Sequence, residues 1–202
     1  MKFLPVAVAT ALFFSLPAFA GAMDDGQMAF DHGDYQAALE QWKPLAEQGN
    51  VEAQDKVGYM YESGYGVDTD EKEAMKWYRK AADQGDAEAL VNIGEMYRNG
   101  KGVTKDPAEA ATWYRKAADK GDPAAEMALG QMYEDGEGVK RDYAEALFWM
   151  SLTQKSGMDD GEVAGKARET YAAHLTPEQM KAVDQRVKNW QPATASKDTE
   201  KK

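Results

Sequence analysis

Histidine and serine are the side chains here that could act as catalysts or metal ligands, and neither stands in a suitable pattern. His32 and His174 each lack a second ligand of matching type three or four residues away. No serine beyond residue 20 lies in a Gly-x-Ser-x-Gly motif; these are Ser63, Ser151, Ser156 and Ser196. The chain has no cysteine, hence no thiol nucleophile, disulfide or thiolate ligand. We therefore predict no metal site, no cofactor and no enzymatic activity.

Carboxylate pairs and methionines are the remaining candidates for chemistry. The pairs Asp24-Asp25 and Asp159-Asp160 are adjacent, so their side chains diverge instead of converging on a substrate. Methionines of an exported, cysteine-free protein could bind copper(I). Three of them, however, recur every 36 residues directly before a tyrosine, which predicts core positions instead: Met60, Met96 and Met132.

The charge balance restricts the class of partner. The 35 acidic residues outnumber the 24 basic ones, which gives a net charge of −11. Nucleic-acid backbones and anionic membrane surfaces would repel such a chain, so we predict that it binds neither. Basic patches on another protein would be attracted to it.

The first twenty residues have the pattern of a signal peptide. Lys2 precedes an uncharged apolar stretch, residues 3–19, and the small-x-small sequence Ala18-Phe19-Ala20 ends it. We predict cleavage after Ala20, a periplasmic or secreted mature protein, and no membrane insertion after cleavage. The alternative is an uncleaved anchor, which the shortness of the stretch and the prolines at positions 5 and 17 disfavour.

The elements that must position any functional residue come from an internal repeat. Glycines, tyrosines and tryptophans recur 36 residues apart: Gly58, Gly94 and Gly130; Tyr61, Tyr97 and Tyr133; Trp77, Trp113 and Trp149. Such a period is typical of repeat proteins, in which each unit stacks on the next. We divide the repeats into residues 53–88, 89–124 and 125–160.

Each unit is predicted to form two helices. Apolar residues follow helical spacing twice per unit, first from Ala53 to Tyr61 and again from Ala74 to Ala82. Asp-x-x-Glu sequences at 70–73, 106–109 and 142–145 predict capping boxes at the start of the second helix. The recurring glycine exemplified by Gly58 lies inside the first helix, where glycine is unfavourable, so we expect a Trp or Tyr to pack closely against it.

The flanking segments are predicted to extend the array. Residues 21–52 form a degenerate N-terminal helix pair, and residues 161–190 form a C-terminal capping pair whose last helix starts at Thr176-Pro177. Residues 191–202 contain no apolar anchor, and we expect this tail to be disordered.

The units resemble the Sel-1-like repeat family, a branch of the tetratricopeptide-repeat superfamily. The pattern Ala…LeuGly-x-x-Tyr-x-x-Gly-x-Gly-Val…Ala-x-x-Trp-x-x-Lys-Ala-Ala-x-x-Gly is met almost throughout from Ala53 to Gly121. Stacked helix pairs of this kind are expected to form an all-α, right-handed superhelical solenoid. The resemblance implies a non-enzymatic adaptor or assembly factor that binds a protein or peptide segment in a concave groove.

The first helix of each pair is expected to line this groove. Its positions that vary between repeats are the candidate binding residues: Asp55, Tyr59, Asn92, Glu95, Glu126 and Gln131. Tyr65, expected to be exposed in a loop, is a separate candidate at the rim. The alternative interpretation treats all of these as ordinary solvated positions. The alternative function is an envelope hydrolase that uses groove carboxylates such as Glu95 and Glu126.

Overall fold

The chain folds into a curved row of helix pairs. The structure, a computed structural model, describes residues 16–157 and 161–193, and these contain helices and no strand. The helices are α1 (Leu16–Asp31), α2 (Tyr35–Glu47), α3 (Val51–Ser63), α4 (Glu71–Asp83), α5 (Ala87–Asn99), α6 (Pro107–Ala118), α7 (Pro123–Asp135), α8 (Tyr143–Lys155), α9 (Glu162–Tyr171) and α10 (Pro177–Asn189). The expected all-α repeat solenoid of helix pairs is confirmed.

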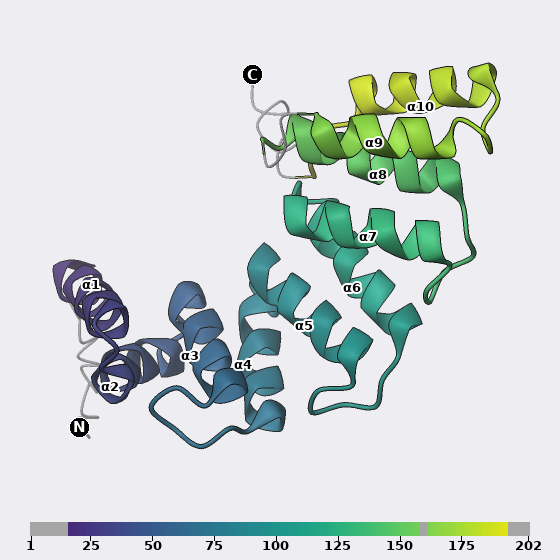
Figure 1. The fold of residues 1–202 in the computed structure, drawn as a ribbon. Helices are drawn as coiled ribbons and strands as arrows, with labels where there is room; N and C mark the ends of the chain where they lie inside the picture. Colours follow the sequence, from purple (N-terminus) through teal and green to yellow (C-terminus); the bar gives the residue numbers. More distant parts are fainter. Residues whose placement is uncertain (1–15, 158–160, 194–202) are drawn as a thin grey trace, which may run out of the picture.

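The row bends into an arc with an inner and an outer side (Figure 1). Each helix from α1 to α8 packs against the next one along the chain, and α10 packs against α8. Helices α1, α3 and α5 lie on the inner side of the arc, whereas α4 and α6 lie on the outer side. Side chains of α1, α3 and α5 are therefore the ones that a guest inside the arc would meet.

The glycines inside the first helices let the second helices approach closely. A Cβ atom built on Gly58 would lie 2.7 Å from the ring of Tyr78, and one on Gly94 would lie 2.8 Å from the ring of Tyr114. The expected aromatic neighbour is thus confirmed in the first two repeats. In the third repeat, Cγ of Met150 lies 2.6 Å from the corresponding position on Gly130 instead.

The second helices are capped by aspartate, but the predicted capping box is wrong. Asp70 accepts hydrogen bonds from the backbone N–H groups of Lys72 and Glu73, as predicted. Its own N–H group, which a capping box would satisfy with the glutamate, donates instead to the carbonyl of Tyr61 (2.9 Å). Equivalent bonds join Asp106 to Tyr97 and Asp142 to Tyr133. The repeat tyrosine's carbonyl therefore takes over the role predicted for the glutamate.

The hydroxyl groups of the same tyrosines form a second set of recurring hydrogen bonds, which joins neighbouring repeats. A basic side chain of one second helix donates to the tyrosine hydroxyl of the following first helix, in the pairs Lys43–Tyr61, Arg79–Tyr97 and Arg115–Tyr133. The repeat methionines predicted to be core residues are fully buried: Met60, Met96 and Met132. The spacing between repeats is thus set by contacts that recur in every unit.

The two ends differ in part from the sequence-based expectations. The described part of α1 begins at Leu16 and continues past Ala20, while residues 1–15 of the predicted signal peptide lie outside the described residues. Among the helices described, none has the length and apolar character to cross a membrane.

At the other end, the tail predicted to be disordered from residue 191 is ordered as far as Ala193. The backbone N–H of Ala193 donates to the carbonyl of Asp119 at 2.7 Å, and Pro192 packs against Gly121. The expectation of disorder was therefore wrong for residues 191–193, because a backbone hydrogen bond and the contact of Pro192 with Gly121 hold this segment in place. Residues 194–202 lie outside the described residues.

Candidate functional site

A cleft of about 330 Å³ opens on the inner side of the arc, between α1, α3 and the start of α5. We call it the N-terminal cleft. Side chains of two kinds line it, aromatic and charged or polar: Gln27, Phe30, Trp42, Glu52, Asp55, Lys56, Tyr59, Asp86 and Glu88. The cleft includes residues of α3 and α5, two of the first helices that were predicted to line a binding groove.

Phe30 is the centre of an aromatic cluster beside this cleft. Its ring lies 5.7 Å from that of Trp42, 6.3 Å from that of Tyr59 and 5.8 Å from that of Tyr65, centroid to centroid. Tyr35 completes the cluster by stacking on Tyr65 at 4.4 Å. Tyr59 is 43% exposed and lines the cleft, and so the cluster presents one aromatic side chain to the cleft. Such a half-exposed ring offers a contact surface for an apolar chain.

Asp55 is the buried acid of the cleft. Only 8% of this residue is exposed, and Nδ2 of Asn92, from the next repeat, donates to its Oδ1 at 3.0 Å. Burial, together with the negative charges of Glu88 and Asp86, raises the pKa of Asp55 to about 7, against the opposing effects of Asn92 and Lys56. The carboxyl group is therefore held where a positive charge nearby would be strongly favourable.

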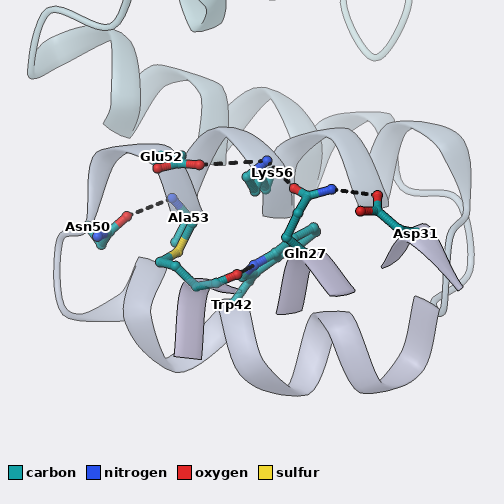
Figure 2. A network of polar contacts seen from close by, with 8 residues as sticks. Gln27, Asp31, Trp42, Asn50, Glu52, Ala53 and Lys56 are labelled. Carbon is teal, nitrogen blue, oxygen red and sulfur yellow. Dashed lines mark hydrogen bonds and ion pairs between the residues drawn. The ribbon is translucent and has the colours of Figure 1, made fainter. Parts of the chain in front are cut away.

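Lys56 is the cation among the residues that line the cleft, and it is held in a network of polar contacts (Figure 2). Its ammonium donates to Oε1 of Gln27 at 2.9 Å and lies 3.7 Å from a carboxylate oxygen of Glu52. It also lies 5.0 Å from the ring centroid of Trp42. Gln27 in turn donates to Asp31. These contacts fix Lys56 along the wall, where its charge is already partnered.

The structure brings together only some of the predicted binding residues. Asp55 and Tyr59 line the cleft, and Asn92 bonds to Asp55. Glu95 and Gln131 are exposed at the position that Tyr59 occupies, one and two repeats further along, outside the cleft. Their role as binding residues stays a prediction.

Two of the predicted residues need correction. Glu126 is fully buried, and its Oε2 accepts a hydrogen bond from the hydroxyl of Ser156 at 2.8 Å, so its carboxylate does not lie on the groove surface. Burial is the main reason that its pKa is raised to about 7. Tyr65 is half-buried in the aromatic cluster and not free in a loop, because its ring stacks on Tyr35.

Sequence reasoning missed the contribution of the N-terminal helix pair. Gln27, Phe30 and Trp42 line the cleft, but the candidates were chosen by comparing equivalent positions of the three regular repeats. The degenerate pair has no such equivalent. The available signal was the aromatic content of the pair itself, since Phe30, Tyr35 and Trp42 all lie within it.

The two histidines have local partners in the structure. Nδ1 of His32 donates to the carbonyl of Met28 at 2.7 Å, and the ring of His174 stacks on Tyr143 at 4.3 Å. Within residues 16–157 and 161–193, no group of three or more His, Cys, Asp or Glu side chains is placed to hold a metal ion.

Comparison with known proteins finds three repeats, each starting two residues before the start given by the sequence division, and the third ending at residue 153 instead of 160. The family model for the Sel1 repeat matches residues 51–86, 87–122 and 123–153. No curated protein matches the chain. Among solved structures, a Sel1 repeat protein from Oxalobacter formigenes is 38% identical, with a TM-score of 0.68 over 76% of this chain.

A protective antigen of uropathogenic Escherichia coli with an SLR fold is 27% identical, with a TM-score of 0.49 over 91% of this chain. The chain spans 62% of the length of the Oxalobacter protein and 48% of the length of the antigen.

Proposed function

Because the chain belongs to the Sel1 repeat family, we propose that it is an exported, non-enzymatic scaffold that binds a segment of another protein along the inner face of its arc. Proteins built from these repeats generally mediate protein–protein interaction. The observation that carries the proposal is the N-terminal cleft, which combines an exposed aromatic ring with a buried acid on the inner side. We further propose that this scaffold acts in the regulation or assembly of the cell envelope.

Physical properties of the inner face support a protein segment as the guest. A stack of helix pairs offers a long, open surface, which suits an extended peptide or a helix. Tyr59 and Met28 are large apolar residues that remain 43% and 59% exposed. A bound segment that covers them would bury apolar surface, which favours binding. Aromatic residues of this kind commonly anchor protein interfaces.

The alternative, a hydrolase that uses groove carboxylates, gains no support from the geometry. A pair of carboxyl groups acting on one bond must face a common space. Glu95 is exposed on α5, whereas Glu126 is fully buried against Ser156. These two residues do not share a surface on which a substrate could lie.

Site-specific photo-crosslinking in the organism that makes the protein tests the proposed binding face. A photoreactive phenylalanine analogue would replace Glu95 or Gln131, the exposed positions equivalent to Tyr59 of the cleft, with exposed Lys76 of the outer helix α4 as the matched control. We expect a discrete protein adduct from positions 95 and 131 and none from position 76. Absence of an adduct at both 95 and 131, or equal adducts from all three positions, would contradict the proposal.

Export has its own test. N-terminal sequencing of the protein recovered from the periplasm or medium is expected to start at Gly21. Recovery of a cell-associated form that still begins at Met1 would contradict the export claim while leaving the binding proposal open to the crosslinking result.

A further inference from the structure

We propose that the N-terminal cleft binds the side chain of a lysine or arginine that the guest protein segment inserts between Tyr59 and the carboxylates of Asp55 and Glu88. This inference rests on the proposed function, since the basic residue belongs to the bound segment. It adds the chemistry that the cleft recognises and the residues that recognise it.

The acids of the cleft outnumber its cation. Four carboxylates line it, on Glu52, Asp55, Asp86 and Glu88, against the single ammonium of Lys56. Glu52 faces Lys56, and Asp86 accepts a hydrogen bond from the N–H of Ala89 as the N-cap of α5. Asp55 and Glu88 are thus the carboxylates left to meet a guest.

Asp55 gives the second, independent observation. It is more than nine-tenths buried, yet its side chain lines the cleft. Oδ1 accepts a hydrogen bond from Asn92, and no hydrogen bond in the described part of the chain reaches Oδ2. Oδ2 is not among the fully buried unpartnered atoms, so solvent still reaches it through the cleft. An entering ammonium or guanidinium could replace that solvent and give the carboxylate a charged donor.

The aromatic side of the cleft fits the stem of a basic side chain. Phe30 and Tyr59 lie on this side, with centroids 6.3 Å apart. Lysine and arginine carry an aliphatic stem that packs on apolar surface while the charged end reaches a polar group. The wall already holds one such arrangement, because the ammonium of Lys56 lies 5.0 Å from the ring centroid of Trp42.

Other guest side chains fit less well. An acidic side chain would be repelled by the surplus of carboxylates. A purely apolar one would cover Tyr59 but would also remove Asp55 from its remaining water without giving it a donor. A basic side chain with an aliphatic stem satisfies both walls at once.

The test uses a phage-displayed library of random dodecapeptides, selected on the immobilised full chain, followed by fluorescence anisotropy with the synthetic peptides. We expect one position of the selected peptides to be enriched in lysine or arginine. Replacing that residue with norleucine, which keeps the stem but lacks the charge, is expected to raise Kd about tenfold or more. On the Asp55→Asn, Glu88→Gln variant the same replacement should have little effect.

Controls separate the cleft from the rest of the inner face. Glu95→Gln, one repeat further along α5, removes an exposed acid outside the cleft and is expected to leave Kd within about twofold. Far-UV circular dichroism checks that each variant is folded. The Asp55→Asn change keeps an acceptor for Asn92, so the hydrogen bond to that residue can persist.

The possible results distinguish this inference from the proposed function. Selected peptides that bind the inner face with no basic preference, or whose binding ignores Asp55→Asn and Glu88→Gln, overturn the inference and leave the scaffold proposal standing. Failure to select any peptide, together with absence of inner-face crosslinks, contradicts the scaffold proposal as well.

Discussion

Helices α3 and α7 occupy equivalent places in the first and third repeats, and the same positions on them do different work. The cleft residue Asp55 of α3 is replaced by Met127 in α7, and Tyr59 is replaced by Gln131. The glycine and methionine that pack in the core are the same in both helices: Gly58 and Met60 in α3, and Gly130 and Met132 in α7. The repeat thus holds its packing positions constant and changes the positions that face the inside of the arc.

One buried position breaks this division. Gln54 of α3 donates to the carbonyl of Ala46 at 3.0 Å and accepts from Gln84 at 2.7 Å, so both ends of its amide are satisfied. Glu126 of α7 is its equivalent, and its Oε2 accepts from Ser156, while Oε1 is buried without a hydrogen-bond partner. The same framework therefore contains a satisfied amide at one end and an incompletely satisfied acid at the other.

The largest expected effect comes from adding a methyl group where the helices touch. Gly58→Ala would drive Cβ into the rigid ring of Tyr78 and should lower the free energy of unfolding by about 2–3 kcal/mol. Gly130→Ala meets Cγ of Met150, which can shift by rotation of its own side chain, and alanine also favours the helix, so a smaller loss of about 1–2 kcal/mol is expected. Urea unfolding of both variants measures the difference; equal effects would contradict the role assigned to ring rigidity.

Glu126→Gln should give the next largest effect, and in the opposite direction. The pKa of Glu126 is raised to about 7 from its ordinary value of 4.5, mainly by burial, so the folded state holds a proton that the unfolded state releases. This contribution to stability is complete below about pH 4.5 and is lost as the pH rises through about 7. We expect the variant to be about 2 kcal/mol more stable than the parent at about pH 8, and nearly equal to it at about pH 4.

Gln54→Glu is the reciprocal control. It removes the donor to the carbonyl of Ala46 and places an acid where the amide is satisfied, so it should destabilise the chain more at about pH 8 than at about pH 4. Thermal unfolding followed by circular dichroism across this pH range measures both variants. A Glu126→Gln stability difference that does not depend on pH would show that the carboxyl group titrates normally.

The smallest effect is expected on the inner surface. Gln131→Tyr places the first repeat's residue on the third, at an exposed position of α7. Because this position is exposed, the free energy of unfolding should change by less than about 0.5 kcal/mol. A larger loss, measured by urea unfolding, would show that inner positions contribute to packing and are not freely variable.

The repeating parts of the fold could be predicted from sequence because each signal occurs three times. Gly58 and its equivalents predicted close helix contact, and Met60 and its equivalents predicted the core; both predictions are confirmed. The starts of the second helices were also predicted, since aspartate at Asp70 caps through its own side chain. These features depend on local chemistry that a short stretch of sequence contains.

Features that depend on contacts between distant residues could not be predicted in this way. Glutamate at position 126 of a helix is expected to be exposed to solvent. Only the three-dimensional structure, in which Glu126 contacts Ser156, 30 residues later, shows that it is buried. The cleft likewise needs Phe30 and Trp42 from outside the regular repeats. Half of the site was therefore visible as variable positions, and half followed from how the first helix pair packs on α3.

The backbone hydrogen bond from Ala193 to Asp119 joins the segment after α10 to the end of α6. Lys155 of α8 donates to the carbonyl of Trp190, and the segment after α10 then crosses back to the end of α6. Helices α7 to α10 therefore lie between two segments that a hydrogen bond joins, so α10 cannot separate from the array without also breaking its contact with the end of α6. This bond couples loss of structure in the last helix to a helix that lies four positions earlier in the chain.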